Sequence, residues 1–192
     1  MSESASRRMS ESAISDKRLA IIGLGNPLRG DDGVGCRMIE ELARRELPPG
    51  VQVLDGGAVG LGLLNLMEGW ERVVIVDAAE MGRRSGEFVR FTPADVRLAS
   101  ASDRPSTGSG HRFSLHHAGL SEALALADAL DQPLPEMVIF GVQPAGVGWG
   151  EGLSPAVEAA LPALADAVLA SAVCSRRREE IIGENYAQDS GD

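Results

Sequence analysis

The chain has 192 residues, of which 44% are hydrophobic and only 4% aromatic, which suits one domain with a core of Ala, Leu, Val and Ile. Its net charge of -10 argues against a general nucleic-acid binder, which needs a basic face. The cysteines, Cys36 and Cys174, are too few for a disulfide framework or a zinc site. No apolar run reaches membrane-spanning length, and the polar start lacks the features of an export signal. We therefore expect a cytoplasmic monomer with no nucleic-acid or membrane partner.

In the first half of the chain, apolar runs alternate with amphipathic segments. The run at 18–24 is rich in Ile and bounded by charge and glycine, which predicts a strand. Val34, Met38 and Leu42 fall on one face of a following helix. The elements expected in this half are strands at 18–24, 51–54 and 73–76, a helix N-capped by Asp31 or Asp32 and running to about Glu46, and a short helix at 61–67.

The second half continues the alternation. A loop rich in Ser, Gly and Pro covers 99–110. Ser154 and Pro155 are typical of the N-cap and first position of a helix. The elements expected here are an edge strand at 87–91, a helix at 119–130, a strand at 137–141 and a long helix at 154–174.

This order of elements predicts a three-layer α/β/α fold with an open, mostly parallel twisted sheet of about five strands. Residues 18–174 form the single domain. Residues 1–17, in which Met-Ser-Glu-Ser-Ala occurs twice, are expected to be a disordered leader, and the charged residues 175–192 a flexible tail.

Acidic residues follow three of the predicted strands. The glycine-rich turn at 23–35 ends in Asp31 and Asp32, Asp55 follows the second strand, and Asp77 closes the third. Ligands of such sheets sit at the carboxyl ends of the strands. Two carboxylates would repel phosphate, so the turn favours a positive ligand such as a metal ion.

All three histidines, His111, His116 and His117, lie close together before the predicted helix at 119–130. A helix start keeps an imidazole neutral and able to bind metal, although a solvated His pair is an equally open interpretation. Two carboxylates and one histidine would suit nickel or zinc.

Other site types fit less well. Leu28 stands where a dinucleotide-binding loop needs its third glycine, and Asp31 and Asp32 would repel the pyrophosphate. The Gly-x-Ser-x-Gly nucleophile motif is absent. The Gly-Leu-Gly-Asn-Pro start is similar to that of peptidyl-tRNA hydrolases, but their histidine-bearing continuation is missing.

Five motifs in order resemble one family, the hydrogenase maturation endopeptidases. The resemblance runs from about Ala20 to Ala172. The motifs are the turn Gly23–Gly35, Leu54-Asp-Gly-Gly57, Val74-Ile-Val-Asp-Ala78, His116-His-Ala-Gly-Leu120 and Gly141-Val-Gln-Pro144.

The resemblance implies an endopeptidase that removes the C-terminal extension of a nickel–iron hydrogenase large-subunit precursor after nickel insertion. It assigns the metal contacts and catalytic positions to Asp32, Asp77 and His116. The nickel would come with the precursor, and another divalent ion could replace it in vitro. Many relatives have Glu where this chain has Asp32.

Supporting or substrate-positioning roles fall to residues next to these contacts. They are Asp31, Asp55, Gly56, Gly57 and His117. Two questions stay open at this point: whether nickel is catalytic or only recognised, and whether the chain cleaves the precursor or is a non-catalytic checkpoint that binds its nickel site.

Overall fold

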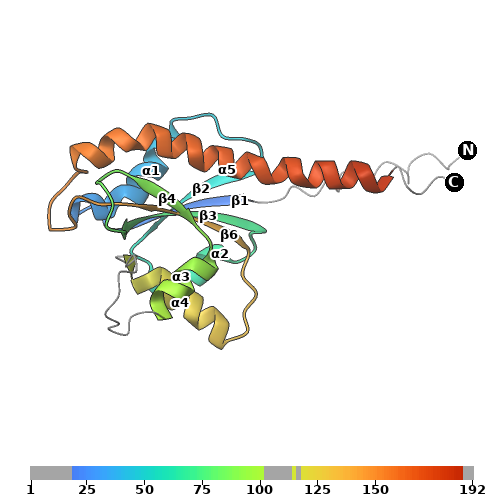
Figure 1. Cartoon of the computed structure of the whole chain (residues 1–192), viewed down its shortest axis with the longest axis horizontal. Coiled ribbons are helices and arrows are strands. Elements are labelled where there is room, and N and C mark those ends of the chain that lie inside the picture. Colours follow the sequence, from blue (N-terminus) through green and yellow to red (C-terminus); the bar gives the residue numbers. More distant parts are fainter. Residues whose placement is uncertain (1–18, 102–113, 116–117, 188–192) are drawn as a thin grey trace, which may run out of the picture.

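The computed structural model describes residues 19–101, 114–115 and 118–187 and centres on one twisted sheet (Figure 1). Four strands are parallel, and the edge strand β4 runs antiparallel to β6. In spatial order they are β2 (Val51–Gly57), β1 (Leu19–Leu24), β3 (Arg72–Glu80), β6 (Glu136–Val142) and β4 (Phe88–Phe91). A two-residue strand, β5 (Ser114–Leu115), pairs with the end of β3. The prediction of a mostly parallel sheet of about five strands is confirmed.

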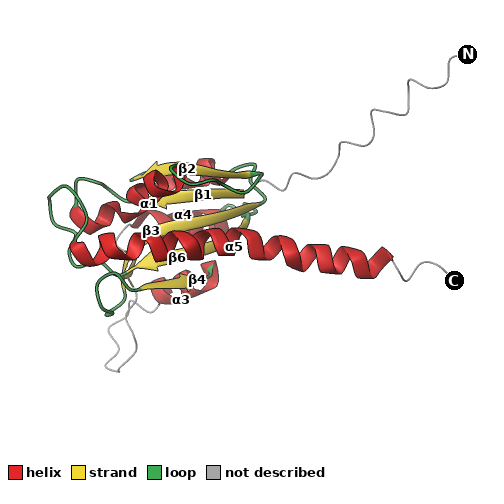
Figure 2. Ribbon diagram, turned by 90° about the horizontal axis from the view of Figure 1, so that it is seen from above, coloured by secondary structure: helices red, strands yellow, loops and turns green. Residues whose placement is uncertain are grey.

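Helices cover both faces of this sheet, which gives the predicted three layers (Figures 1 and 2). One face carries α1 (Val34–Ala43) and α5 (Pro155–Ala187), and the other carries α2 (Leu63–Met67), α3 (Pro93–Ala101) and α4 (Ala118–Ala129). Two short 3-10 helices, η1 (Gly30–Gly33) and η2 (Gly60–Gly62), precede α1 and α2. The hydrophobic core is therefore split into one cluster on each face.

The alternation of side chains along β3 decides which face the candidate site uses. Val74 and Val76 belong to the cluster under α1 and α5, whereas Val73 and Ile75 belong to the cluster under α2 and α4. Because successive strand residues point to opposite faces, Asp77 lies on the same face as Ile75. Its carboxyl group is thus on the α4 side.

Gly23 and Gly35 allow α1 to pack directly on the backbone of β1. A Cβ on Gly23 would lie 2.2 Å from the carbonyl oxygen of Gly35, and one on Gly35 would lie 2.1 Å from that of Leu24. Neither position has room for a side chain. This close approach holds η1, with Asp31 and Asp32, over the carboxyl end of β1.

The start of α1 differs from the prediction. Neither Asp31 nor Asp32 caps the helix, because η1 precedes it and the N-cap is Gly33, with no side-chain hydrogen bond. The helix ends at Ala43 rather than near Glu46. The two carboxylates bond instead to loop atoms described below.

Strand β3 also runs further than predicted. Asp77 lies within it rather than at its end, since Ala78 continues the pairing with Val142, and Ala79 and Glu80 pair with β5. Strand β2 likewise extends to Gly57 and includes the Asp-Gly-Gly motif.

Helix α3 was missed in the sequence, where residues from 99 onward were predicted to be loop. Its start is a capping arrangement in which Asp95 accepts from Thr92 N and Oγ, both at 2.7 Å, and Pro93 takes the first helical position. That Thr-Pro-x-Asp pattern was the available signal. The rest of the predicted loop, 102–110, lies outside the described residues, as does the leader 1–17.

Helix α5 continues to Ala187, past the predicted end at Cys174, and extends beyond the sheet (Figure 2). Arg and Glu, both good helix formers, make up six of the 13 residues added at 175–187. The stretch Pro155–Ala172 is long and apolar enough to span a membrane by length and composition. Only 39% of this stretch is buried, and that part includes its large apolar side chains Leu161, Leu164 and Val168, which pack against the sheet.

The glycine contact yields a stability prediction. We expect Gly35→Ala to lower the free energy of unfolding by about 3 kcal/mol or more, because the new Cβ overlaps backbone that has no room to move. Gly148→Ala is the matched control, since nothing lies within 4 Å of its added Cβ. Urea unfolding measures both variants. Equal stabilities would contradict the close packing of α1 on β1.

Candidate functional site

The strand order puts a topological switch point, where open α/β sheets form their ligand crevice, between β1 and β3. The chain passes from β1 to β2 on one side and returns to β3 on the other, so the connections diverge at the carboxyl ends of β1 and β3. This divergence is where open α/β sheets bind ligands. Asp32 follows β1 and Asp77 lies near the end of β3, so the two flank the crevice.

Asp31 holds together the two loops at the rim of the site. Its side chain is buried, and its carboxylate accepts hydrogen bonds from Ala145 N at 2.7 Å, Ser154 N at 2.6 Å and Ser154 Oγ at 2.9 Å, with a longer one from Gly146 N at 3.4 Å. These donors use both oxygens. Asp31 therefore fixes the loop before α5 onto the glycine-rich turn.

Asp32 is also buried, at 1% exposure, but bonds within its own turn. Its Oδ2 accepts from Asn26 N at 3.1 Å. The turn needs glycine here, because Gly25 has φ +123° and a Cβ on it would lie 1.7 Å from the carbonyl oxygen of Asp32. The backbone of the Gly-Asn-Pro segment thus positions Asp32.

Asp77 has the most unusual environment of the described acids. It is fully buried, its Oδ1 accepts from Ala78 N at 2.8 Å, and its Oδ2 has no hydrogen-bond partner among the described residues. Burial, with a further contribution from the charge of Asp32, raises the pKa of Asp77 to about 8. A buried carboxyl group with a spare oxygen beside a second carboxylate is a suitable partner for a divalent cation.

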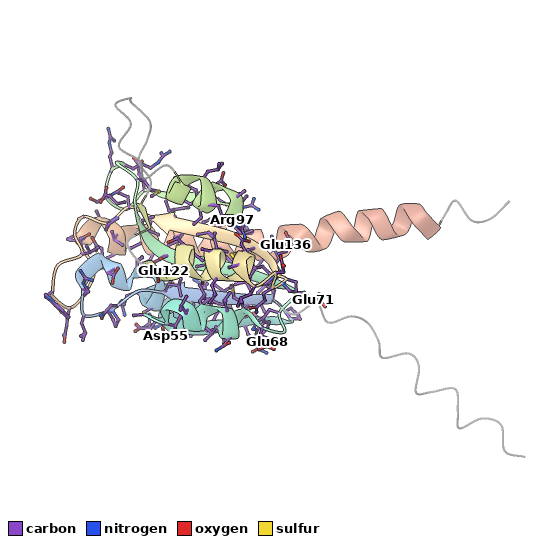
Figure 3. The ribbon with its side chains drawn as sticks, turned by 90° about the horizontal axis from the view of Figure 1, so that it is seen from below. Asp55, Glu68, Glu71, Arg97, Glu122 and Glu136 are labelled. Carbon is purple, nitrogen blue, oxygen red and sulfur yellow. The ribbon has the colours of Figure 1, made fainter. Side chains whose placement is uncertain are left out.

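Asp55 lies apart from this pair. It is exposed at the end of β2, at the same end of the sheet as Glu122 (Figure 3). Its Oδ1 accepts from Gly57 N at 2.9 Å and from the Cys36 thiol at 3.4 Å. Burial and the neighbouring Asp55 raise the pKa of Cys36 to about 12, so the thiol stays protonated and donates.

The glycines of the Asp-Gly-Gly motif have separate tasks. A Cβ on Gly56 would lie 2.7 Å from the Leu24 side chain, so Gly56 is needed for packing. Gly57 has φ +48° and its carbonyl accepts from Gly25 N at 2.9 Å, which joins the motif to the glycine-rich turn.

Gln143 was not singled out from the sequence as a site residue. It is buried, and its Oε1 accepts from Met81 N at 2.7 Å and Arg83 N at 3.1 Å, while its Nε2 donates to Glu80 Oε1 at 2.7 Å. It thereby fixes the segment that follows β3 against the end of β6. The Gly-Val-Gln-Pro motif contained the residue, but only its neighbours in space show its role.

The histidines His111, His116 and His117 lie outside the described residues. Within the described ranges, no group of three or more His, Cys, Asp or Glu side chains could hold a metal ion. The described part of the site is therefore the pair Asp32 and Asp77. Helix α4 begins at Ala118, directly after His116 and His117, on the face to which Asp77 points.

The hydrogenase maturation protease family model matches residues 36–171, starting just after the carboxylates of η1. The chain belongs to the hydrogenase maturation protease family. Its relatives include the hydrogenase expression/formation protein HupD of Bradyrhizobium diazoefficiens, 34% identical over 74% of this chain and 71% of that protein. The hydrogenase 2 maturation protease of Escherichia coli is 28% identical over 80% of this chain and 90% of its own length.

Solved structures of the same family share the fold. The hydrogenase maturating endopeptidase HybD from E. coli has a TM-score of 0.64 at 28% identity, covering 82% of this chain and 93% of that one. The maturation protease HybD from Thermococcus kodakarensis has a TM-score of 0.61 at 28% identity, covering 78% and 95%. As a hydrogenase maturation protease, the chain is a peptide hydrolase, which confirms the family and enzyme class predicted from the motifs.

The role of Asp31 can be tested by stability. We expect Asp31→Asn to lower the free energy of unfolding by about 3 kcal/mol, because an amide nitrogen replaces one acceptor oxygen among buried N–H donors. Hydrogen exchange of the Ala145 and Ser154 backbone amides should also become faster in the Asp31→Asn variant. Asp131→Asn, at an exposed position after α4, is the matched control. Unchanged exchange at both amides would contradict the role of Asp31 in holding this loop.

Proposed function

We propose that the chain removes the C-terminal extension of a nickel–iron hydrogenase large-subunit precursor after nickel has been inserted. Asp32, Asp77 and His116 recognise the nickel that the precursor carries. The single observation that supports this proposal is the buried Asp77, whose Oδ2 lacks a hydrogen-bond partner within the described residues and whose neighbour is the carboxylate of Asp32.

The electrostatics make this pair a detector of positive charge. Without a cation, the burial that raises the pKa of Asp77 to about 8 keeps it largely protonated at neutral pH. A divalent ion compensates both carboxylates, so Asp77 ionises and its free oxygen gains a partner. A precursor without metal offers no such compensation. Cleavage would then wait for nickel insertion.

His116 completes the proposed set. Its place two residues before α4 would put it at the positive end of the helix, where an imidazole stays neutral and can bind a metal. Carboxylate and imidazole ligands together suit nickel. The nickel belongs to the substrate, and the chain's own residues recognise it and hold the precursor against the crevice.

The test is cleavage of precursor with and without nickel. Wild-type protein should cleave the nickel-loaded precursor at least 100-fold faster than the metal-free form. Asp77→Asn should lose cleavage of the loaded form, because an amide is a weak metal ligand and gains no charge when the metal arrives. Asp131→Asn, a change of the same size at an exposed position, should cleave like wild type. Gel analysis of the released extension measures all four reactions.

Each contrary result has a distinct meaning. Equal cleavage of both precursor forms by wild type would overturn nickel recognition. An active Asp77→Asn variant would remove Asp77 from the metal contacts. Tight binding of the loaded precursor without any cleavage would favour the non-catalytic checkpoint instead.

A further inference from the structure

An apolar pocket opens beside the candidate site, and the nickel contacts proposed above do not explain it. It has a volume of about 220 Å³. Its walls include Leu24 at the end of β1, Val59 after β2, Leu63 of α2 and Leu120 of α4. We call it the Val59 pocket.

The Val59 pocket lies on the same face of the sheet as Asp77. Leu24 belongs to the hydrophobic cluster under α2 and α4, the face to which Asp77 also points. The register pairs Gly23 with Val76, so Leu24 and Asp77 follow side by side on neighbouring strands. Neighbouring strands are about 4.8 Å apart. The distance from Asp77 to the start of the pocket is therefore about the length of one or two residues of an extended peptide.

The pocket is built into the fold before any ligand arrives. Gly119 of α4 packs against Gly60, where an added Cβ would lie 2.9 Å from the Gly60 Cα, so no side chain from this contact fills the space. The loop that carries Val59 is fixed at its start by the bonds of Gly57 to Asp55 and Gly25. Preformed walls reduce the ordering cost of binding.

The polarity of the pocket walls indicates which kind of group can bind there. Glu122, which is exposed, is the one charged residue that lines the pocket within the described part of the chain. Val59 and Leu61, 37% and 53% exposed, continue the apolar surface beside the opening. A dry apolar cavity of about 150 Å³ holds a benzene ring. The Val59 pocket therefore has the size and polarity for one aliphatic side chain.

Because the chain is a peptide hydrolase, its substrate peptide must cross the carboxyl edge of the sheet near Asp77. We infer that the Val59 pocket binds one aliphatic side chain of the precursor within three residues of the cleaved bond and so contributes to substrate choice. This inference rests on the proposed function, because it takes the large-subunit precursor as the peptide.

The test combines pocket variants with precursor variants. Nickel-loaded precursors carry Ala, Leu, Phe or Asp at each of the three residues on either side of the cleaved bond. At one position, wild type should prefer Leu to Asp by about 10-fold or more in kcat/KM, the discrimination expected of an apolar pocket. Val59→Trp, which fills the pocket, should remove the advantage of Leu over Ala at that position and leave the other positions unchanged.

Two controls separate folding from specificity. Leu98→Trp adds the same ring at a 71% exposed position on α3 and should keep the wild-type preference. Val59→Ala, which enlarges the pocket at a partly exposed position, should shift the preference toward larger side chains such as Phe. If Val59→Trp fails to fold, the change in side-chain preference of Val59→Ala tests the inference instead.

The outcomes distinguish this inference from the proposed function. If wild type cleaves the loaded precursor but all preferences survive in both Val59 variants, the pocket inference is overturned and the proposed function stands. If wild type cleaves none of the nickel-loaded precursors, the proposed function itself fails. A side-chain preference that changes only in the Val59 variants supports the inference that the Val59 pocket binds a side chain of the precursor.

Discussion

Asp77 is fully buried in the central strand β3, and one of its carboxyl oxygens has no hydrogen-bond donor within the described residues. A carboxyl group in that position costs stability when it ionises, and the nearby Asp32 raises the cost. The cost falls when a cation is present. Under the proposed function, the environment that disfavours the charged state of Asp77 without a cation would make the site responsive to a metal.

The fold supplies the rigidity that this arrangement needs. The contact of Gly23 with Gly35 brings η1 over β1, and the Gly25 conformation sets Asp32 in its turn. Asp31 fixes the loop before α5 onto that turn, and Gln143 fixes the segment that follows β3. Residues that do not contact the metal themselves commonly orient those that do. The carboxylate pair is in this way held before substrate arrives.

Much of this was accessible from the sequence. An apolar run rich in Ile identified β1, and a continuous β-branched run identified β3. That the glycine-rich turn with two acids binds a cation rather than phosphate stays a prediction. Spacing alone did not separate the tasks of Asp31 and Asp32, and the resemblance to the family supplied that assignment. The contacts of Asp31 were not accessible, because its donors Ala145 and Ser154 lie far along the chain. The roles of Gln143 and of the Val59 pocket depend on contacts between distant segments for the same reason. The high charge of residues 175–192 predicts a flexible tail, but Arg and Glu also favour helix, and α5 continues to Ala187.

The titration of Asp77 tests most directly whether this buried carboxyl group ionises when a metal binds. Carbon-13 NMR of the side-chain carboxyl, assigned with Asp77→Asn, follows it in the metal-free protein and with saturating Zn²⁺ as a diamagnetic substitute. We expect a titration midpoint near pH 8 without metal, because burial favours the protonated carboxyl, and an ionised carboxylate at neutral pH once zinc is bound. A midpoint near the ordinary 3.8, or no response to zinc, would contradict this expectation.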